Sequence, residues 1–133
     1  MPQAKGRFDV TLNPLPAYND ESGAGLGRRS IDKRFHGALD ATSRGEMLSA
    51  MGTAAGSAGY VAIERVSGTL DGRRGSFTLQ HHATMTRGAP ALAISVVPDS
   101  GSGELAGLSG TMAIEIRDGA HFYAFDYALA PPA

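Results

Sequence analysis

The sequence predicts an all-β protein, an eight-stranded antiparallel β-barrel with little or no helix. Two observations predict this fold. Apolar and polar residues alternate in eight separate segments, and turn-forming residues separate most of these segments. Eight antiparallel strands with short connections can close into a barrel, which removes the unpaired edges of an open sheet, and a two-sheet sandwich is the alternative. The expected strands cover residues 7–12, 30–36, 39–48, 60–70, 75–85, 91–97, 110–116 and 121–129.

The first expected strand has one apolar and one polar face, with Phe8, Val10 and Leu12 on the apolar side. Two prolines and a polar, glycine-rich run follow this strand. Because proline cannot donate a hydrogen bond to a central ladder, a flexible loop is expected near residues 13–26. Three glycines within residues 49–59 favour a second irregular connection over a short helix.

Turn dipeptides mark the later hairpins. Asp71-Gly72 stands between two β-rich runs and predicts the hairpin of the fourth and fifth expected strands. Asp118-Gly119 predicts the last turn in the same way.

Glycines also punctuate the segment 97–112, which crosses from the sixth expected strand to the seventh. Glycine has no Cβ and adopts positive φ without a steric penalty. Gly107 and Gly110 are therefore expected to bend a strand, as the curvature of a barrel requires.

Composition indicates one domain that covers residues 1–133. The chain is 42% hydrophobic and 19% charged, which allows a real core to form. Its 12 basic and 13 acidic side chains give a formal net charge of -1, so the chain has no electrostatic footprint for nucleic acid or an anionic membrane. The Ala-Pro-Pro-Ala tail at the C-terminus is expected to be disordered.

The chain contains no cysteine, which excludes disulfides, thiolate zinc sites and a cysteine nucleophile. The N-terminal residues lack the apolar core of a signal peptide, and no apolar run approaches the ~20 residues of a membrane helix. A soluble, cytoplasmic protein with no membrane partner is therefore expected. The sequence leaves open whether the chain forms a homo-oligomer.

Two ionisable residues stand in apolar rows of neighbouring strands. His81 shares a strand face with Phe77 and Met85, and Glu64 shares one with Tyr60. Pairing across the Asp-Gly turn brings Glu64 and His81 onto the same interior face. A buried histidine is neutral near pH 7, and a carboxylate in such a row must find a partner or raise its pKa. Glu64 and His81 are therefore the candidate catalytic acid–base pair.

The same two residues also have a structural explanation. His81 can be a core histidine that one backbone or hydroxyl partner satisfies. Glu64 can form a buried ion pair across neighbouring strands, and Lys33, Arg44 and Arg65 are the candidate partners. The sequence alone does not choose between the catalytic and the structural role.

Aromatic, sulfur-containing and carboxylate side chains are the candidates for ligand binding. The last expected strand carries an aromatic face of the kind that lines small-molecule cavities. Aromatic stripes on barrel strands also fill cores, which is their commoner role. The candidate ligand-binding residues are Tyr60, Glu46, Tyr123, Phe125, Phe77 and Met85.

No metal site and no cofactor are expected. His81 and His82 are neighbours on a strand, so their side chains point to opposite faces and cannot chelate one metal together. The glycine-containing segments lack the strand-turn-helix context of nucleotide and phosphate loops, and no nucleophile elbow occurs.

Several short patterns carry a resemblance to known families. They are Gly45-Glu46-Met47-Leu48, Gly59-Tyr60-Val61-Ala62-Ile63-Glu64-Arg65, Gly75-Ser76-Phe77, Gln80-His81 and Gly103-Glu104-Leu105-Ala106-Gly107. From about Gly27 to Leu129 the chain resembles a small bacterial family of uncharacterised domains. The segment 97–112 resembles the turn-and-strand segment of the allene oxide cyclase and dirigent barrels. These resemblances imply an allene oxide cyclase-like, calycin-like barrel with a mostly apolar interior.

The resemblance also implies conformational control of a small molecule. Allene oxide cyclases fold a reactive lipid epoxide in their cavity and steer its ring closure, and dirigent proteins orient phenoxy radicals. We expect a barrel that binds a small apolar molecule with one carbonyl, phenol or comparable polar group. A cofactor-free cyclase, isomerase or lyase that uses Glu64 and His81 is one alternative, and a non-catalytic structural or oligomerising module is the other.

Overall fold

The computed structural model describes residues 2–130, which form nine β-strands and no helix. The strands are β1 (Gln3–Leu15), β2 (Leu26–Gly37), β3 (Leu39–Met51), β4 (Ala58–Leu70), β5 (Arg73–Thr86), β6 (Ala89–Val96), β7 (Ser102–Gly103), β8 (Leu108–Arg117) and β9 (Ala120–Leu129). The eight longer strands correspond to the eight predicted ones, and β7 is an additional two-residue strand. Residues 131–133 of the predicted C-terminal tail lie outside the described residues. No helix in residues 2–130 is long and apolar enough to cross a membrane.

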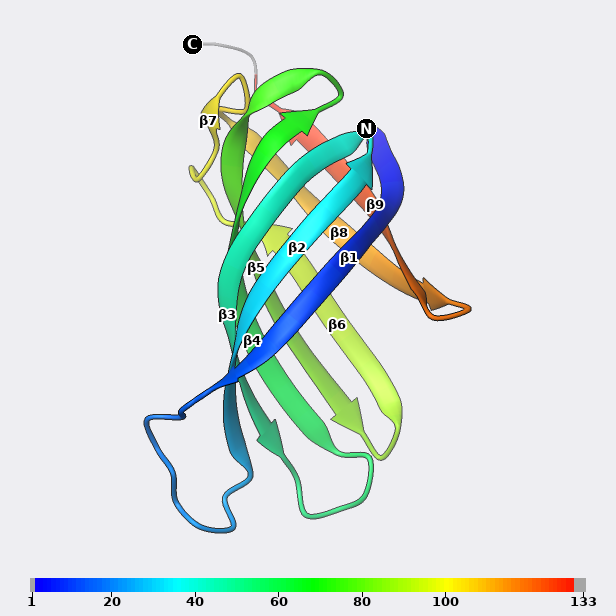
Figure 1. The fold of residues 1–133 in the computed structure, drawn as a ribbon. Coiled ribbons are helices and arrows are strands. Elements are labelled where there is room, and N and C mark those ends of the chain that lie inside the picture. The colour runs from blue at the N-terminus through cyan, green and yellow to red at the C-terminus, as the bar shows by residue number, and fades with distance from the viewer. Residues whose placement is uncertain (1, 131–133) are drawn as a thin grey trace.

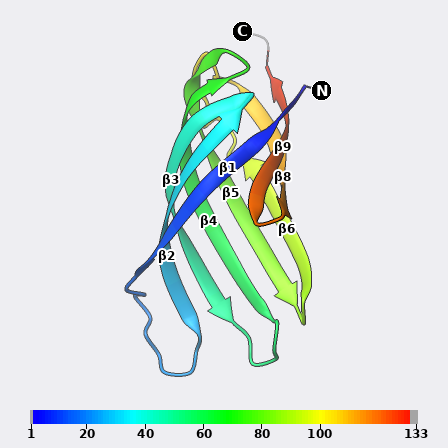
Figure 2. The same ribbon diagram turned by 45° about the vertical axis from the view of Figure 1, so that its right-hand side comes forward.

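All strand pairs are antiparallel, and together they form a barrel (Figures 1 and 2). The long strands follow the order β4-β3-β2-β1-β9-β8-β6-β5, and the pairing of β4 with β5 joins the two ends. The short strand β7 lies beside the start of β5. The predicted eight-stranded antiparallel barrel is therefore confirmed.

The seam between β6 and β8 is the shortest in the barrel. Among the described residues these two strands share one pair, Ser95 with Thr111, whereas β4 and β5 pair along their whole length. In Figure 1 the β8–β9 hairpin diverges from β6 below this point. The remaining edges of β6 and β8 that face each other carry no ladder partner.

The first strand extends further than the sequence indicates. Pro14 lies within β1 and pairs with Arg29 of β2, so the loop predicted near residues 13–26 begins only at residue 16 and ends, as expected, where β2 starts. The pairing of β1 with β9 ends at Phe8, and the second edge of β1 is unpaired beyond this residue. A strand edge of this kind accommodates proline without the loss of a ladder hydrogen bond. The second predicted connection is irregular between Met51 and Ala58, as expected.

One half of the barrel interior is packed with apolar side chains. This closed half lies at the end that holds the β2–β3 and β4–β5 turns, at the top of Figure 1. Leu105, in the loop before β8, is also buried in it. The core of the closed half consists of Ala4, Phe8, Phe35, Leu39, Ala41, Val66, Leu70, Phe77, Leu79, Ile94, Val96, Leu105, Leu108, Met112, Tyr123, Phe125 and Tyr127.

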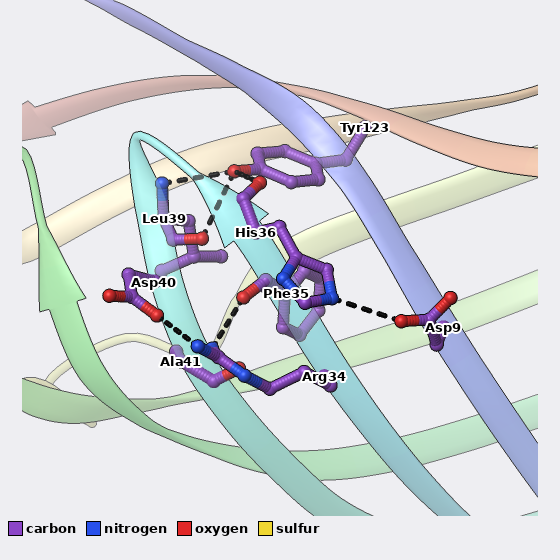
Figure 3. Close-up of polar contacts among 8 residues, drawn as sticks. All are labelled: Asp9, Arg34, Phe35, His36, Leu39, Asp40, Ala41 and Tyr123. Carbon is purple, nitrogen blue, oxygen red and sulfur yellow. Dashed lines mark hydrogen bonds and ion pairs between the residues drawn. The ribbon is translucent and has the colours of Figure 1, made fainter.

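A buried tyrosine fixes the β2–β3 turn to the last strand (Figure 3). The hydroxyl of Tyr123 accepts a hydrogen bond from the amide of Leu39 at 2.9 Å and donates one to the carbonyl of His36 at 2.8 Å. Because these backbone groups belong to the turn, Tyr123 satisfies polar atoms that would otherwise be buried without a partner. The side chain thus has a structural role in the closed half.

Toward the opposite end of the barrel, inward-facing side chains become accessible to solvent. On β5 the inward row passes from buried His81 to half-buried Ala83 and then to Met85, which is 41% exposed. The inward rows of β4 and β6 change in the same way, to half-buried Tyr60 and to Leu92, which is 44% exposed. We call this region the open half, and its inward-facing residues include Leu12, Arg29, Met47, Ser49, Ala58, Tyr60, Ala83, Met85 and Leu92.

Glycine at position 110 allows β8 to bend against β9. Its φ is 156°, and an added Cβ would overlap the backbone oxygen of Asp126 and lie 3.0 Å from the ring of Phe125. These constraints require glycine at position 110, and the bend itself stays a prediction, because the pairing of β8 with β9 runs without interruption through this residue. Gly107 precedes β8 and has a φ of 81° in the connecting turn, so the prediction that it bends a strand was wrong. A turn uses the same freedom of glycine for a different purpose.

Replacement of Gly110 with alanine is expected to lower the free energy of unfolding by about 2–4 kcal/mol, because both the backbone conformation and the space exclude a Cβ. Denaturant unfolding measures this loss. The control is Gly119→Asn in the β8–β9 turn, where φ is 78° and no atom lies within 4 Å of an added Cβ. Asparagine tolerates this conformation, so the control is expected to lose less than about 1 kcal/mol. Equal losses in the two variants would contradict the steric argument.

Candidate functional site

Four polar side chains from four neighbouring strands meet between the closed and the open half. Lys33 comes from β2, Ser43 from β3, Glu64 from β4 and His81 from β5. All four are buried, and Glu64 has no exposed surface while His81 is 5% exposed. We call these four residues the polar layer.

The register of the strands brings these residues together. β4 pairs with β5 so that Ala62 stands opposite His81, and Glu64 lies two residues further along the same inner face. β2 pairs with β3 so that Lys33 stands opposite Ser43. The predicted placement of Glu64 and His81 on one interior face is therefore confirmed.

The carboxylate of Glu64 is the centre of the polar layer. Lys33 Nζ donates a hydrogen bond to Oε2 at 2.8 Å, and Nε2 of His81 lies 2.5 Å from the same oxygen. Ser43 Oγ donates to Oε1 at 2.7 Å. Both carboxylate oxygens are thus held, and the ion pair with Lys33 is one of the partners that the sequence proposed.

These contacts keep Glu64 ionised. Burial raises the pKa of its carboxyl group, but the hydrogen bond from His81 and the charge of Lys33 outweigh burial and lower the pKa from 4.5 to about 2. The ammonium of Lys33 also lies 5.1 Å and 5.7 Å from the ring centres of Phe8 and Phe35. At neutral pH Glu64 is therefore a fixed anion that orients Lys33 and His81.

His81 has one nitrogen without a partner. Because Nε2 faces the carboxylate of Glu64, Nε2 carries a proton, and in the neutral tautomer Nδ1 keeps a lone pair. Nδ1 is shielded from solvent and has no hydrogen-bond partner among the described residues. A buried polar atom without a partner costs about 1–3 kcal/mol, and native proteins contain few of them.

The register also indicates which way Nδ1 faces. Glu64 lies on the closed-half side of His81, and the two nitrogens of an imidazole point to nearly opposite sides of the ring. Nδ1 is therefore turned toward the open half. The ring of Tyr60 lies on that side, with its centre 6.3 Å from that of His81. Burial and the charge of Glu64 raise the pKa of the Tyr60 hydroxyl, so this hydroxyl stays protonated at neutral pH.

The other predicted ligand-binding residues lie in different places. Tyr60 and Met85 belong to the open half, where inward-facing side chains reach solvent. Phe77, Tyr123 and Phe125 belong to the packed core of the closed half, where they leave no free surface for a ligand. This is the core-filling role that the sequence offered as the alternative for an aromatic stripe.

Glu46 lies outside the barrel. A groove of about 840 Å³ runs over the outer face of β3, β4 and β5, and Glu46 is paired there with Arg28 at 2.5 Å. Arg44 and Arg65 also line this outer groove, so neither reaches the buried carboxylate of the polar layer. The sheet therefore separates Glu46 from the polar layer.

The sequence did not single out Ser43 as a site residue. It occupies an inward position between Ala41 and Gly45, and a serine in such a row looks like any serine on a strand. Only the register with β4 brings its hydroxyl to the carboxylate of Glu64. Within residues 2–130 no group of three or more histidine, aspartate or glutamate side chains is arranged to hold a metal ion.

Comparison with known proteins places this barrel in a family. The profile of the family described as "Protein of unknown function (DUF3224)" matches residues 4–127. The chain belongs to the DUF3224 family. The crystal structure of a DUF3224 protein of unknown function from Shewanella oneidensis MR-1 is similar over 99% of each chain, with 55% sequence identity and a TM-score of 0.95. A search of curated proteins found no match. The expected membership of an uncharacterised family is thus confirmed, and the DUF3224 fold is the barrel described above.

Removal of one partner of the buried ion pair is expected to destabilise the protein strongly. Lys33→Met leaves a buried carboxylate, and Glu64→Gln leaves a buried ammonium, so each is expected to lose about 3–5 kcal/mol. The double variant removes both charges and is expected to lose less than the sum of the two single losses. Denaturant unfolding of the four proteins measures this coupling. Additive losses, or a double variant that fails to fold while a single variant folds, would contradict the ion pair.

The lowered pKa of Glu64 predicts a loss of stability in acid. In the unfolded chain the carboxyl group takes up a proton near pH 4.5, but in the fold it does so near pH 2. Its contribution is therefore present above pH 4.5 and is lost as the pH falls toward 2, by up to about 3 kcal/mol. The free energy of unfolding of the wild type and the double variant should converge across this range. Curves that stay parallel would rule out a lowered pKa.

Proposed function

We propose that the open half of the barrel binds a small, largely apolar molecule whose one polar group reaches His81. The unpartnered Nδ1 of His81 is the observation that carries this proposal. A bound polar group would give this nitrogen the hydrogen bond that the described residues do not provide. The gain would offset the free-energy cost of about 1–3 kcal/mol that an unsatisfied buried atom imposes.

The lining of the open half supports an apolar ligand. Met47, Met85 and Leu92 face inward there, alanines at 58 and 83 contribute small side chains, and Arg29 is a cationic side chain on the same face. An eight-stranded barrel has an interior just wide enough to be filled by side chains or to hold one small ligand. Apolar walls with a few convergent polar groups are typical of small-molecule sites.

Cofactor-free acid–base catalysis is the second candidate function, and the contact of 2.5 Å between Glu64 and His81 favours it. A carboxylate that holds one imidazole nitrogen leaves the other nitrogen to accept a proton from a substrate. Because Glu64 is ionised, His81 would be the base and Glu64 its positioning partner. This division of roles agrees with the resemblance to the allene oxide cyclase and dirigent barrels, in which a cavity steers a cyclisation or a coupling.

A non-catalytic structural module is the competing explanation. Under this explanation the polar layer only fixes the strands, and the open half binds nothing. The two explanations differ in one expectation. A bulky side chain placed in the open half abolishes ligand binding under the first explanation and changes only stability under the second.

Ligand binding is tested with a matched pair of variants on β5. Ala83→Trp places a large side chain in the open half, and Thr84→Trp places the same side chain on the outer face, one residue away. A thermal-shift screen of apolar carbonyl and phenolic compounds is expected to find stabilisers of the wild type and of Thr84→Trp, but not of Ala83→Trp. A ligand at 100 times its Kd adds about 2.7 kcal/mol to the stability of the native state.

Two results would contradict the proposal. The first is a broad screen that finds no stabiliser of the wild type. The second is a set of stabilisers that act equally on Ala83→Trp, because these compounds would then bind outside the open half.

A further inference from the structure

The polar layer retains two groups that a ligand could use. Nδ1 of His81 has a lone pair and no partner among the described residues. Lys33 carries three N–H groups, of which the structure assigns one to Glu64. Both side chains contact the same oxygen of Glu64, but Nδ1 points away from that oxygen, so a ligand atom bound at Nδ1 lies beyond hydrogen-bond distance of Lys33 Nζ.

We propose that the ligand of the open half is a phenol or an enol, and that its hydroxyl proton passes to Nδ1 of His81. This inference rests on the proposed function and names the ligand class. In the transfer the O–H bond breaks, an N–H bond forms at Nδ1, and the electron pair stays on the ligand oxygen. No other reactant is needed.

The chemistry of Nδ1 excludes the other common polar groups. A lone pair requires a donor, so a carbonyl oxygen or an ionised carboxylate would face it with a second lone pair. An aliphatic alcohol can donate a hydrogen bond but is too weak an acid to give up its proton to an imidazole. A phenol or enol hydroxyl donates a hydrogen bond and is a much stronger acid than an alcohol, and a conjugated electron-withdrawing group, which Tyr60 lacks, brings its pKa close to that of an imidazole.

The charges of the polar layer match this transfer. Lys33 and Glu64 form an ion pair in the resting state, and the proposed transfer starts from the neutral tautomer of His81. After the transfer the imidazolium lies between the Glu64 carboxylate at Nε2 and the ligand oxyanion at Nδ1, so it has an opposite charge on each side. Every new charge thus acquires an opposite charge. Glu64 stays ionised throughout, because its two cationic neighbours oppose its protonation.

The surroundings of His81 fit an unsaturated ring. Met47 and Met85 line the open half, and thioether sulfur makes favourable contacts with aromatic rings. Tyr60 adds an aromatic edge beside His81. The ionisable groups on the inner face around His81 are Glu64 and Tyr60 from β4 and Lys33 and Arg29 from β2, while β6 presents the apolar Ile94 opposite it.

The probe for this proposal is 4-nitrophenol, whose yellow phenolate band reports its ionisation directly. At a pH at which most of the free probe is protonated, mixing with the wild type is expected to produce the phenolate band. The matched control ligand is 4-nitroanisole, which has no proton to transfer and is expected to bind at least tenfold more weakly. Nitrogen NMR of the histidine rings is expected to show that Nδ1 of one ring gains a proton.

Variants locate the signal. Thr84→Trp is expected to keep the phenolate band and Ala83→Trp to lose it, which excludes ionisation at the arginines of the outer groove. His81→Gln is expected to lose the band while it still binds 4-nitroanisole. If His81→Gln does not fold, the NMR signal of the wild-type ring decides the same point.

Failure of this inference is distinguishable from failure of the proposed function. If 4-nitrophenol and 4-nitroanisole bind equally and no phenolate band forms, the ligand class is wrong and the apolar site stands. If neither probe binds but other compounds in the thermal-shift screen stabilise the protein, the ligand class is again wrong and the apolar site stands. A screen without any stabiliser overturns both proposals.

Discussion

A single carboxylate without access to solvent, that of Glu64, is the constraint on which the middle of this barrel depends. An isolated ion in such surroundings costs several kcal/mol, and the surrounding side chains must compensate this cost. Lys33, Ser43 and His81 do so from three other strands. A slip of one residue in the register of β2–β3, β3–β4 or β4–β5 would turn a partner of Glu64 to the outer face of the barrel. The buried charge therefore favours one register for half of the sheet.

The polar layer also explains why the two halves of the interior differ. Above it, Phe35, Phe77 and Phe125 fill the barrel, and Tyr123 satisfies the turn that closes the end. Below it, the inward rows contain small or flexible residues, such as Ala83 and Met85, and they reach solvent. One barrel thus combines a packed core, which supplies stability, with an accessible region whose inner limit is polar. A packed core on both sides of the polar layer would remove this accessible region.

The sequence predicted the strands well because a half-buried strand leaves a period of two in the chain, and the eight segments follow it. It placed Glu64 and His81 on one face because their hairpin is joined by a tight Asp-Gly turn, which limits the possible registers. Ser43 and the choice of Lys33 over Arg44 or Arg65 could not be predicted in this way, because they depend on pairings between β2, β3 and β4. The position of Glu46 outside the barrel has the same cause. Proline fits within a strand where the strand edge is unpaired, as at Pro14, and the sequence does not reveal which edges are unpaired.

The ionisation of Glu64 determines which residue of the Glu64–His81 pair can exchange a proton. A carboxylate with a raised pKa could serve as an acid, but three hydrogen-bond donors hold this one as an anion. Any proton exchange in the polar layer therefore falls to the histidine. A network that served stability alone would be more stable with a hydrogen-bond partner at each imidazole nitrogen of His81. A serine or threonine at position 83, two residues along the same inner face, could supply the second partner. The chain has alanine there, which leaves the nitrogen without a hydrogen-bond partner among the described residues. An arrangement that gives up stability at one atom while it satisfies every other atom around it is typical of a site that meets a ligand.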